Sequence, residues 1–156
     1  MRLTAVAIGQ RMPSWVTQGW CEYARRFSRG LSLELREIPA IKRSHNADIE
    51  SVRRRECEAL LSAVPDNNYV IALDERGRQW TSAELSSQMQ AWMQNGRDVA
   101  FLVGGPDGFS DESLAQADHR WSLGPLTLPH PLVRIVLAEQ LYRAWTITQN
   151  HPYHRD

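Results

Sequence analysis

The chain has 156 residues, which is enough for one domain with a substantial hydrophobic core. Its 18 basic and 18 acidic residues give a formal net charge of zero, so strong non-specific binding to nucleic acid is not expected. No run approaches the roughly 18 apolar residues of a membrane span. Cys21 and Cys57 lie in no metal or redox spacing, which favours free thiols in a reducing cytoplasm.

The first half of the chain predicts strands and helices in alternation. Residues 2–9 form a short apolar run that ends in glycine, and we expect a strand there rather than a signal peptide. Apolar residues recur with helical spacing over residues 13–27, and residues 31–38 alternate as a strand near a sheet edge does. A basic loop then leads into a helix expected over residues 47–63, with Asn46 as its cap and a solvent face that includes Arg53, Arg54, Glu56 and Glu58.

The second half of the chain continues the alternation. Residues 69–73 and 99–103 are continuous apolar runs, as expected of buried parallel strands. Between them, Thr81 and Glu84 form a capping box that predicts a helix ending at Gly96. We therefore expect a second strand–helix–strand unit in this part of the chain.

The last part of the chain predicts a short helix, a brief strand and a long helix. Ser110 caps the short helix, and residues 121–123 form the strand. Pro131 suits the first turn of the long helix, which runs to Thr148 and is apolar on more than one side. One side can pack on the sheet, and the other is available to a second copy of the chain, so a homodimer is expected.

This element order predicts a single α/β domain over residues 1–156, with a mostly parallel sheet flanked by helices. Ligands of such sheets lie beyond the carboxyl ends of the strands. Three strand ends have unusual sequences, and these are Leu73-Asp74, Gly104 to Gly108 and Leu123 to Pro129. For the glycine segment alone, a tight turn before a helix is an equally good interpretation.

Familiar catalytic and binding motifs are missing from the sequence. It contains no GxGxxG, GxxxxGK[ST] or GxSxG motif, which argues against a dinucleotide site, a P-loop and a serine hydrolase. His151 and His154 have a spacing seen in metal sites, but no third ligand is evident, so no metal is expected.

Basic residues are concentrated in the first third of the chain. Between Arg11 and Arg55 there are ten Arg and Lys residues against five Asp and Glu residues. From charge alone, a solvated charged face is the more common explanation of such an excess. If the chain contacts RNA, the expected residues are Arg25, Arg26, Lys42 and Arg43.

Several segments together resemble the RlmH family of SPOUT-class methyltransferases. They are AIGQRMPSW at residues 7–15, the strand followed by GGPDG, WSLGPLTLPHPLVR, YRAW and the terminal NHPYHR. The resemblance implies a C-terminal trefoil knot formed by about residues 70–156, an exception to the rule that chains do not thread loops. It also implies methylation, by S-adenosylmethionine, of the N3 atom of a pseudouridine in 23S ribosomal RNA on the assembled ribosome, by a cytoplasmic homodimer.

The resemblance assigns roles to residues in three loops and in the tail. The cofactor-binding residues that it implies are Leu73, Asp74, Gly104, Gly105, Pro106, Leu123, Gly124, Pro125, Leu126, Thr127, Leu128 and Pro129. For proton transfer, base stacking and phosphate contacts, the candidates are His154, Tyr153, Arg143, Arg155 and His130. Simpler interpretations exist, because His130 can merely set a turn and Arg143 can merely pair with Glu139.

Two other functions remain open from the sequence. One is a non-catalytic ribosome-binding module that has kept the fold, against which the glycines at positions 104, 105 and 108 argue. The other is a methyltransferase with a transfer RNA substrate, because related knotted enzymes act on transfer RNA. The terminal NHPYHR favours the ribosomal substrate.

Overall fold

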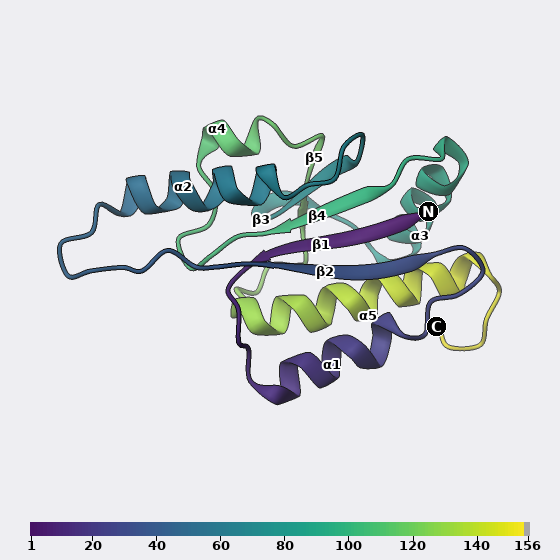
Figure 1. The fold of residues 1–156 in the computed structure, drawn as a ribbon. Helices are drawn as coiled ribbons and strands as arrows, with labels where there is room; N and C mark the ends of the chain where they lie inside the picture. The colour runs from purple at the N-terminus through teal and green to yellow at the C-terminus, as the bar shows by residue number, and fades with distance from the viewer. Residues whose placement is uncertain (155–156) are drawn as a thin grey trace.

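The computed structural model describes residues 1–154 and contains a five-stranded sheet with the order β2-β1-β4-β3-β5 (Figure 1). All four neighbouring pairs of strands are parallel, which confirms the expected mostly parallel sheet. The strands are β1 (Arg2–Ile8), β2 (Ser32–Ile38), β3 (Tyr69–Gln79), β4 (Val99–Val103) and β5 (His119–Ser122). The helices are α1 (Ser14–Ala24), α2 (Ile49–Ser62), α3 (Ser82–Asn95), α4 (Asp111–Leu114) and α5 (His130–Thr148).

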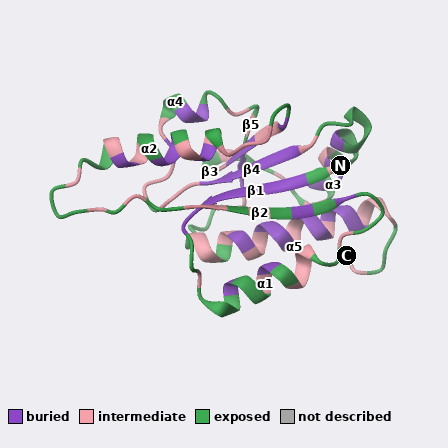
Figure 2. Ribbon diagram, in the orientation of Figure 1, coloured by how far each residue is buried: buried purple, intermediate pink, exposed green. Residues whose placement is uncertain are grey.

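The helices cover both faces of the sheet. On one face, α1, α3 and α5 pack with the sheet in a large apolar core, and on the other α2 and α4 pack in a smaller one (Figure 2). β4 is buried along its whole length, as its uninterrupted apolar sequence predicts. β2 lies at the edge, as its alternating sequence predicts. None of the helices in residues 1–154 is long and apolar enough to cross a membrane.

β3 is longer than its sequence predicts. The apolar run ends at Leu73, but the strand continues through six more residues to Gln79, and its pairing with β5 shifts register between Leu73 and Arg78. Gly77 permits this irregularity, because a Cβ atom there would lie 2.7 Å from the backbone of Arg120 and Trp121. The segment expected to be a loop is therefore a bulged strand, and it pairs with a β5 that begins earlier than predicted.

The prediction for α2 was wrong in two details. Asp48 rather than Asn46 caps the helix, and its side chain accepts a hydrogen bond from the Glu50 amide at 3.1 Å. Glu56, expected on the solvent face, is only 2 % exposed. The reason is its partner Arg43, whose guanidinium reaches it from the preceding loop.

The two-sided burial of α5 has a different cause from the one expected. The helix is buried on more than one side, but α1 and α3 of the same chain pack against it in addition to the sheet. The approach to α1 is close, because a Cβ atom on Gly19 would lie 2.7 Å from Cδ1 of Ile135. The apolar sides of α5 are therefore no evidence for a second copy of the chain, and a homodimer needs support from other features.

Candidate functional site at the carboxyl edge of the sheet

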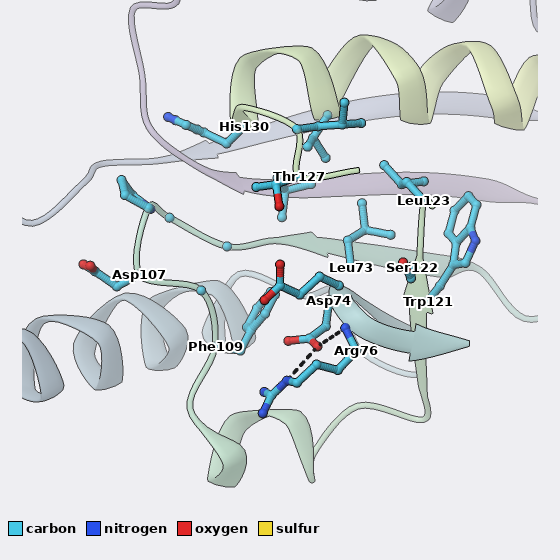
Figure 3. A pocket seen from close by; sticks show the side chains of 18 of the residues that line it. Leu73, Asp74, Arg76, Asp107, Phe109, Trp121, Ser122, Leu123, Thr127 and His130 are labelled. Atoms are coloured by element: carbon cyan, nitrogen blue, oxygen red, sulfur yellow. Dashed lines mark hydrogen bonds and ion pairs between the residues drawn. The ribbon is translucent and has the colours of Figure 1, made fainter. Parts of the chain in front are cut away.

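A cavity of about 440 Å³ lies at the carboxyl ends of β4 and β5 and beside the bulge of β3 (Figure 3). The three unusual strand ends of the sequence all contribute to its wall. Ten of the twelve residues expected to bind a cofactor line it, and these are Leu73, Asp74, Gly104, Gly105, Pro106, Leu123, Gly124, Leu126, Thr127 and Leu128. Pro125 and Pro129 do not line the cavity. The topology thus brings together segments that are far apart in the sequence.

The glycine segment after β4 forms a tight turn against the cavity. The Gly108 amide donates to the Gly105 carbonyl at 3.0 Å, and Gly108 has a φ of +68°, which suits glycine. At Gly105 a side chain has no room, because a Cβ atom would lie 2.6 Å from Oε2 of Glu56. The tight turn is therefore observed, and it also forms part of the cavity wall.

The bulged part of β3 supplies charged groups to the cavity. Asp74 Oδ1 accepts hydrogen bonds from the amide of Arg76 at 2.9 Å and from its Nε at 3.2 Å (Figure 3). This hydrogen bond to Asp74 raises the pKa of the Arg76 guanidinium. The carboxylate of Asp74 is thereby fixed at the cavity wall, while the side chains of Leu73 and Leu123 supply apolar surface.

His130, the first residue of α5, also lines the cavity. Burial is the main cause that lowers its pKa, and the neighbouring Arg134 guanidinium lowers it further, against an opposing effect of Glu56. Its Nδ1 has no hydrogen-bond partner within residues 1–154. The lowered pKa favours the neutral imidazole, and its buried Nδ1 is left without a partner among the described residues.

Two of the other expected catalytic residues, Tyr153 and Arg143, meet at Glu139 of α5 and do not line the cavity. Tyr153 donates from its hydroxyl to Glu139 Oε1 at 3.0 Å, and Arg143 donates to the same oxygen at 2.6 Å. Burial and the hydrogen bond to Glu139 raise the pKa of Tyr153. At about 1.5 Å per helical residue, Arg143 is roughly 20 Å along the helix from His130. Within one chain, the described tail residues Tyr153 and His154 therefore do not line the cavity.

The remaining expected site residues have other surroundings. The tail residue His154 has a buried Nδ1 without a partner in the described part of the chain, and Arg155 lies outside the described residues. Arg25 and Arg26 both pair with Glu22 on α1. Lys42 is exposed, whereas Arg43 is held by Glu56 and Asp107. No group of three or more potential metal ligands occurs among residues 1–154.

Arg134 is an important residue that the sequence analysis missed. It is 1 % exposed, and its Nη2 donates to the carbonyls of Ile8 at 3.1 Å and Gly9 at 2.7 Å. Burial lowers the pKa of its guanidinium. It ties the start of α5 to the end of β1, next to the cavity. A basic residue within the apolar run of residues 132–138 was the available signal.

Known proteins share this fold and, in part, this sequence. The solved structure of a probable methylase family protein from Haemophilus influenzae Rd KW20 aligns with a TM-score of 0.54 at 13 % identity, covering 99 % of this chain and 70 % of the other. A structure described as giving insights into 2-OH methylation of C/U34 on tRNA aligns with a TM-score of 0.50 at 18 % identity, covering 93 % and 97 %. At these identities the likeness concerns the fold alone.

The sequence relatives are much closer. Proteins called ribosomal RNA large subunit methyltransferase H, from Thioalkalivibrio sulfidiphilus (strain HL-EbGR7) and Hahella chejuensis (strain KCTC 2396), are each 52 % identical to this chain over 156 residues and the full length of both partners. The model of the family described as predicted SPOUT methyltransferase matches residues 1–154. The resemblance drawn from the sequence motifs is confirmed, and the chain belongs to the SPOUT family of methyltransferases.

Proposed function

We propose that this protein transfers a methyl group from S-adenosylmethionine to the N3 atom of a pseudouridine in 23S ribosomal RNA, on the assembled ribosome in the cytoplasm. The observation that carries the proposal is full-length 52 % identity to two proteins called ribosomal RNA large subunit methyltransferase H. The cavity built by all three unusual strand ends supports it from the structure. The distant likeness to a tRNA-related structure concerns the fold and does not favour tRNA.

The cavity has the properties that a methyl donor of this kind needs. Its volume of about 440 Å³ lies within the range of small-molecule sites, which are mostly apolar with a few placed polar groups. We propose that Leu73 and Leu123 hold the adenine, and that the open backbone of the Gly104–Gly108 turn approaches the donor closely. Leu126 lines the cavity and is 78 % exposed, so we expect its side chain to become buried against a bound donor.

His130 is the proposed proton acceptor. The donor supplies an activated methyl group on a sulfonium, so the chain has to align the acceptor and assist the loss of a proton. The base's N3 forms a bond to the methyl carbon, the carbon–sulfur bond breaks, and the N3 proton passes to a basic nitrogen. The lowered pKa of His130 supports this role because the imidazole stays neutral at neutral pH.

We infer that the active enzyme is a homodimer in which the tail of one subunit completes the cavity of the other. The separation of roughly 20 Å between Arg143 and His130 along α5 supports this arrangement, because Tyr153 folds back along the helix only as far as Glu139. Apolar side chains near the starts of α1 and α5 are exposed, Trp15 at 51 % and Leu132 at 38 %, and offer a contact surface; α5 begins at the cavity with His130. The proposed roles of Tyr153, His154 and Arg155 depend on this second copy.

The charge of the protein supports a large, pre-shaped substrate. The net charge is zero, and Arg25, Arg26 and Arg43 all pair with carboxylates of the chain itself. Because non-specific RNA affinity comes mainly from cationic contacts with phosphates, free RNA is expected to bind weakly. An assembled ribosome can instead present several surfaces at once.

The test is to incubate the protein with labelled S-adenosylmethionine and either intact ribosomes or stripped ribosomal RNA, both lacking the modification. Label at N3 of one pseudouridine, entering intact ribosomes only, is the expected result. Label entering free RNA or tRNA would keep the methyltransferase and replace the substrate. No label in any sample, together with no heat of S-adenosylmethionine binding, would leave a non-catalytic binding module.

A further inference from the structure

The loop of residues 39–48, between β2 and α2, is fixed by one buried carboxylate. This loop forms neither helix nor strand, yet it is tied at two points to Glu56, which is only 2 % exposed. The Ile41 amide donates to Glu56 Oε1 at 3.1 Å. Arg43 donates from Nη1 to Oε1 at 3.2 Å and from Nη2 to Oε2 at 3.1 Å. A bidentate pair of this kind fixes direction as well as distance.

The same guanidinium also holds the glycine turn of the cavity. Arg43 donates to Asp107 Oδ2 from Nε at 2.9 Å and from Nη2 at 2.6 Å. Asp107 belongs to the Gly104–Gly108 turn and lines the cavity. One Arg43 nitrogen, Nη2, thus bridges the carboxylates of Glu56 and Asp107.

Helix α2 touches this turn directly as well. Oε2 of Glu56 lies so close to Gly105 that a Cβ atom there would be 2.6 Å away. The neighbouring Cys57 is buried, and its Sγ lies 4.0 Å from the Gly108 carbonyl oxygen. The position of the turn is therefore set by α2 on one side and by Arg43 on the other.

We propose that Arg43 and Glu56 are positioning residues of the methyl-donor site, which hold the Gly104–Gly108 turn in its binding geometry. This inference rests on the proposed function in so far as the cavity binds S-adenosylmethionine. It reassigns Arg43, which the sequence marks as a candidate RNA contact. The guanidinium is engaged by two carboxylates of its own chain and has little capacity left for a phosphate.

The contacts of Arg43 with Glu56 and Asp107, here called the clamp, make a specific electrostatic prediction. Glu56 and Asp107 both lie within hydrogen-bonding distance of one nitrogen, so they face each other once the guanidinium is removed. Two close carboxylates repel each other, and Asp107 is the mobile partner because it belongs to a turn rather than a helix. Arg43→Met should therefore push the turn outward, and a second substitution, Asp107→Asn, should relieve the repulsion.

The experiment measures S-adenosylmethionine binding by calorimetry for the wild type, Arg43→Met, and Arg43→Met with Asp107→Asn. Arg54→Met is the matched control, because Arg54 loses the same charge on the exposed face of α2. We expect on the order of tenfold weaker binding for Arg43→Met, partial recovery in the double variant, and wild-type affinity in the control. Wild-type affinity in Arg43→Met would overturn the inference, whatever happens to ribosome binding, as would a double variant no better than Arg43→Met.

Amide hydrogen exchange of residues 104–108 tests the clamp without a ligand. Faster exchange in Arg43→Met than in Arg54→Met supports the inference, and equal exchange overturns it. If the wild type binds no S-adenosylmethionine, the proposed function is contradicted. The exchange rates would still decide whether Arg43 and Glu56 hold the turn. If Arg43→Met does not fold, Arg43→Lys keeps the charge but loses the bidentate geometry, so weaker S-adenosylmethionine binding and faster exchange of residues 104–108 than in Arg54→Met are again expected, and wild-type values of both would overturn the inference.

Discussion

Arg134 illustrates how one buried side chain joins two distant parts of the chain. Its guanidinium satisfies the carbonyls at the end of β1, so Arg134→Met leaves these acceptors buried and unpaired. We expect a loss of about 3 kcal/mol in the free energy of unfolding, measured by urea denaturation. The exposed Arg54→Met should change it by less than about 0.5 kcal/mol. Equal stabilities of the two variants would contradict the structural role of Arg134.

The pH dependence of activity tests His130. Because its pKa is lowered, the imidazole takes up a proton only below its ordinary value of about 6.5. A base must be neutral to act, so kcat/KM should stay level as the pH falls from neutrality and then drop below about 6.5. His130→Asn should lower kcat/KM about a hundredfold and abolish the fall of kcat/KM at acidic pH. If the same fall persists in His130→Asn, another group is responsible for it.

The sequence alone identified most residues of the cavity but not how they are used. The glycines of residues 104–108 and the leucines of residues 123–129 are recognisable in the sequence, because close backbone approach requires glycine and an apolar wall requires apolar side chains. Glu56 could not be predicted as buried, since its partner Arg43 lies 13 positions earlier in a loop of irregular structure. A charged residue on a helix reads as solvent-exposed until the fold supplies a counter-ion.

At the level of elements, the bulge in β3 can be tested by substituting Gly77. Gly77→Ala places a methyl group against the backbone of β5, and backbone atoms cannot rotate away. We expect the free energy of unfolding to fall by about 2 kcal/mol, accompanied by weaker S-adenosylmethionine binding, because Asp74 and Arg76 move with the bulge.

Gly96→Ala serves as the comparison in the same denaturation and calorimetry experiments. Gly96 has a φ of +67° and open space around its Cβ position, so alanine there suffers backbone strain alone. That strain should cost about 1 kcal/mol and leave cofactor affinity unchanged. If Gly77→Ala were as mild as Gly96→Ala and bound S-adenosylmethionine normally, the close approach of β3 and β5 would not matter for the site.

Elements differ in how far their sequences predict them. The capping box at Thr81 and the left-handed Gly96 mark both ends of α3 through local chemistry, and both are confirmed. The extension of β3 carries mostly charged residues and becomes a strand only by pairing with β5, which is a tertiary effect. Asn46 and Asp48 are both good helix caps, so the sequence could not choose between them.

At the level of the whole molecule, the proposed exchange of tails between subunits can be tested with mixed dimers. One subunit lacks residues 150–156, and the other carries Gly105→Val, which puts a side chain into the space of Glu56. Each homodimer should be inactive. Mixtures should recover methyl transfer, because the intact tail of one subunit then meets the intact cavity of the other.

Size-exclusion chromatography should establish that the mixed species are dimers before activity is measured. Total inactivity of every mixture would argue that each tail serves its own chain.

The expected trefoil knot stays a prediction at this scale, and the sheet order is compatible with it. Dimerisation could not be inferred soundly from the sequence, since α5 is covered by α1 and α3 of its own chain.

The central position of β1 has a consequence for how the protein is made. The first strand to be synthesised lies between β2 and β4, with Leu3 paired to Val99. A nascent chain can therefore pair one edge of β1 early and must leave the other open until β4 has been translated. Such long-range pairing gives a high contact order and slow folding. A chain that stalls before β4 exposes an apolar strand edge, which is a template for aggregation.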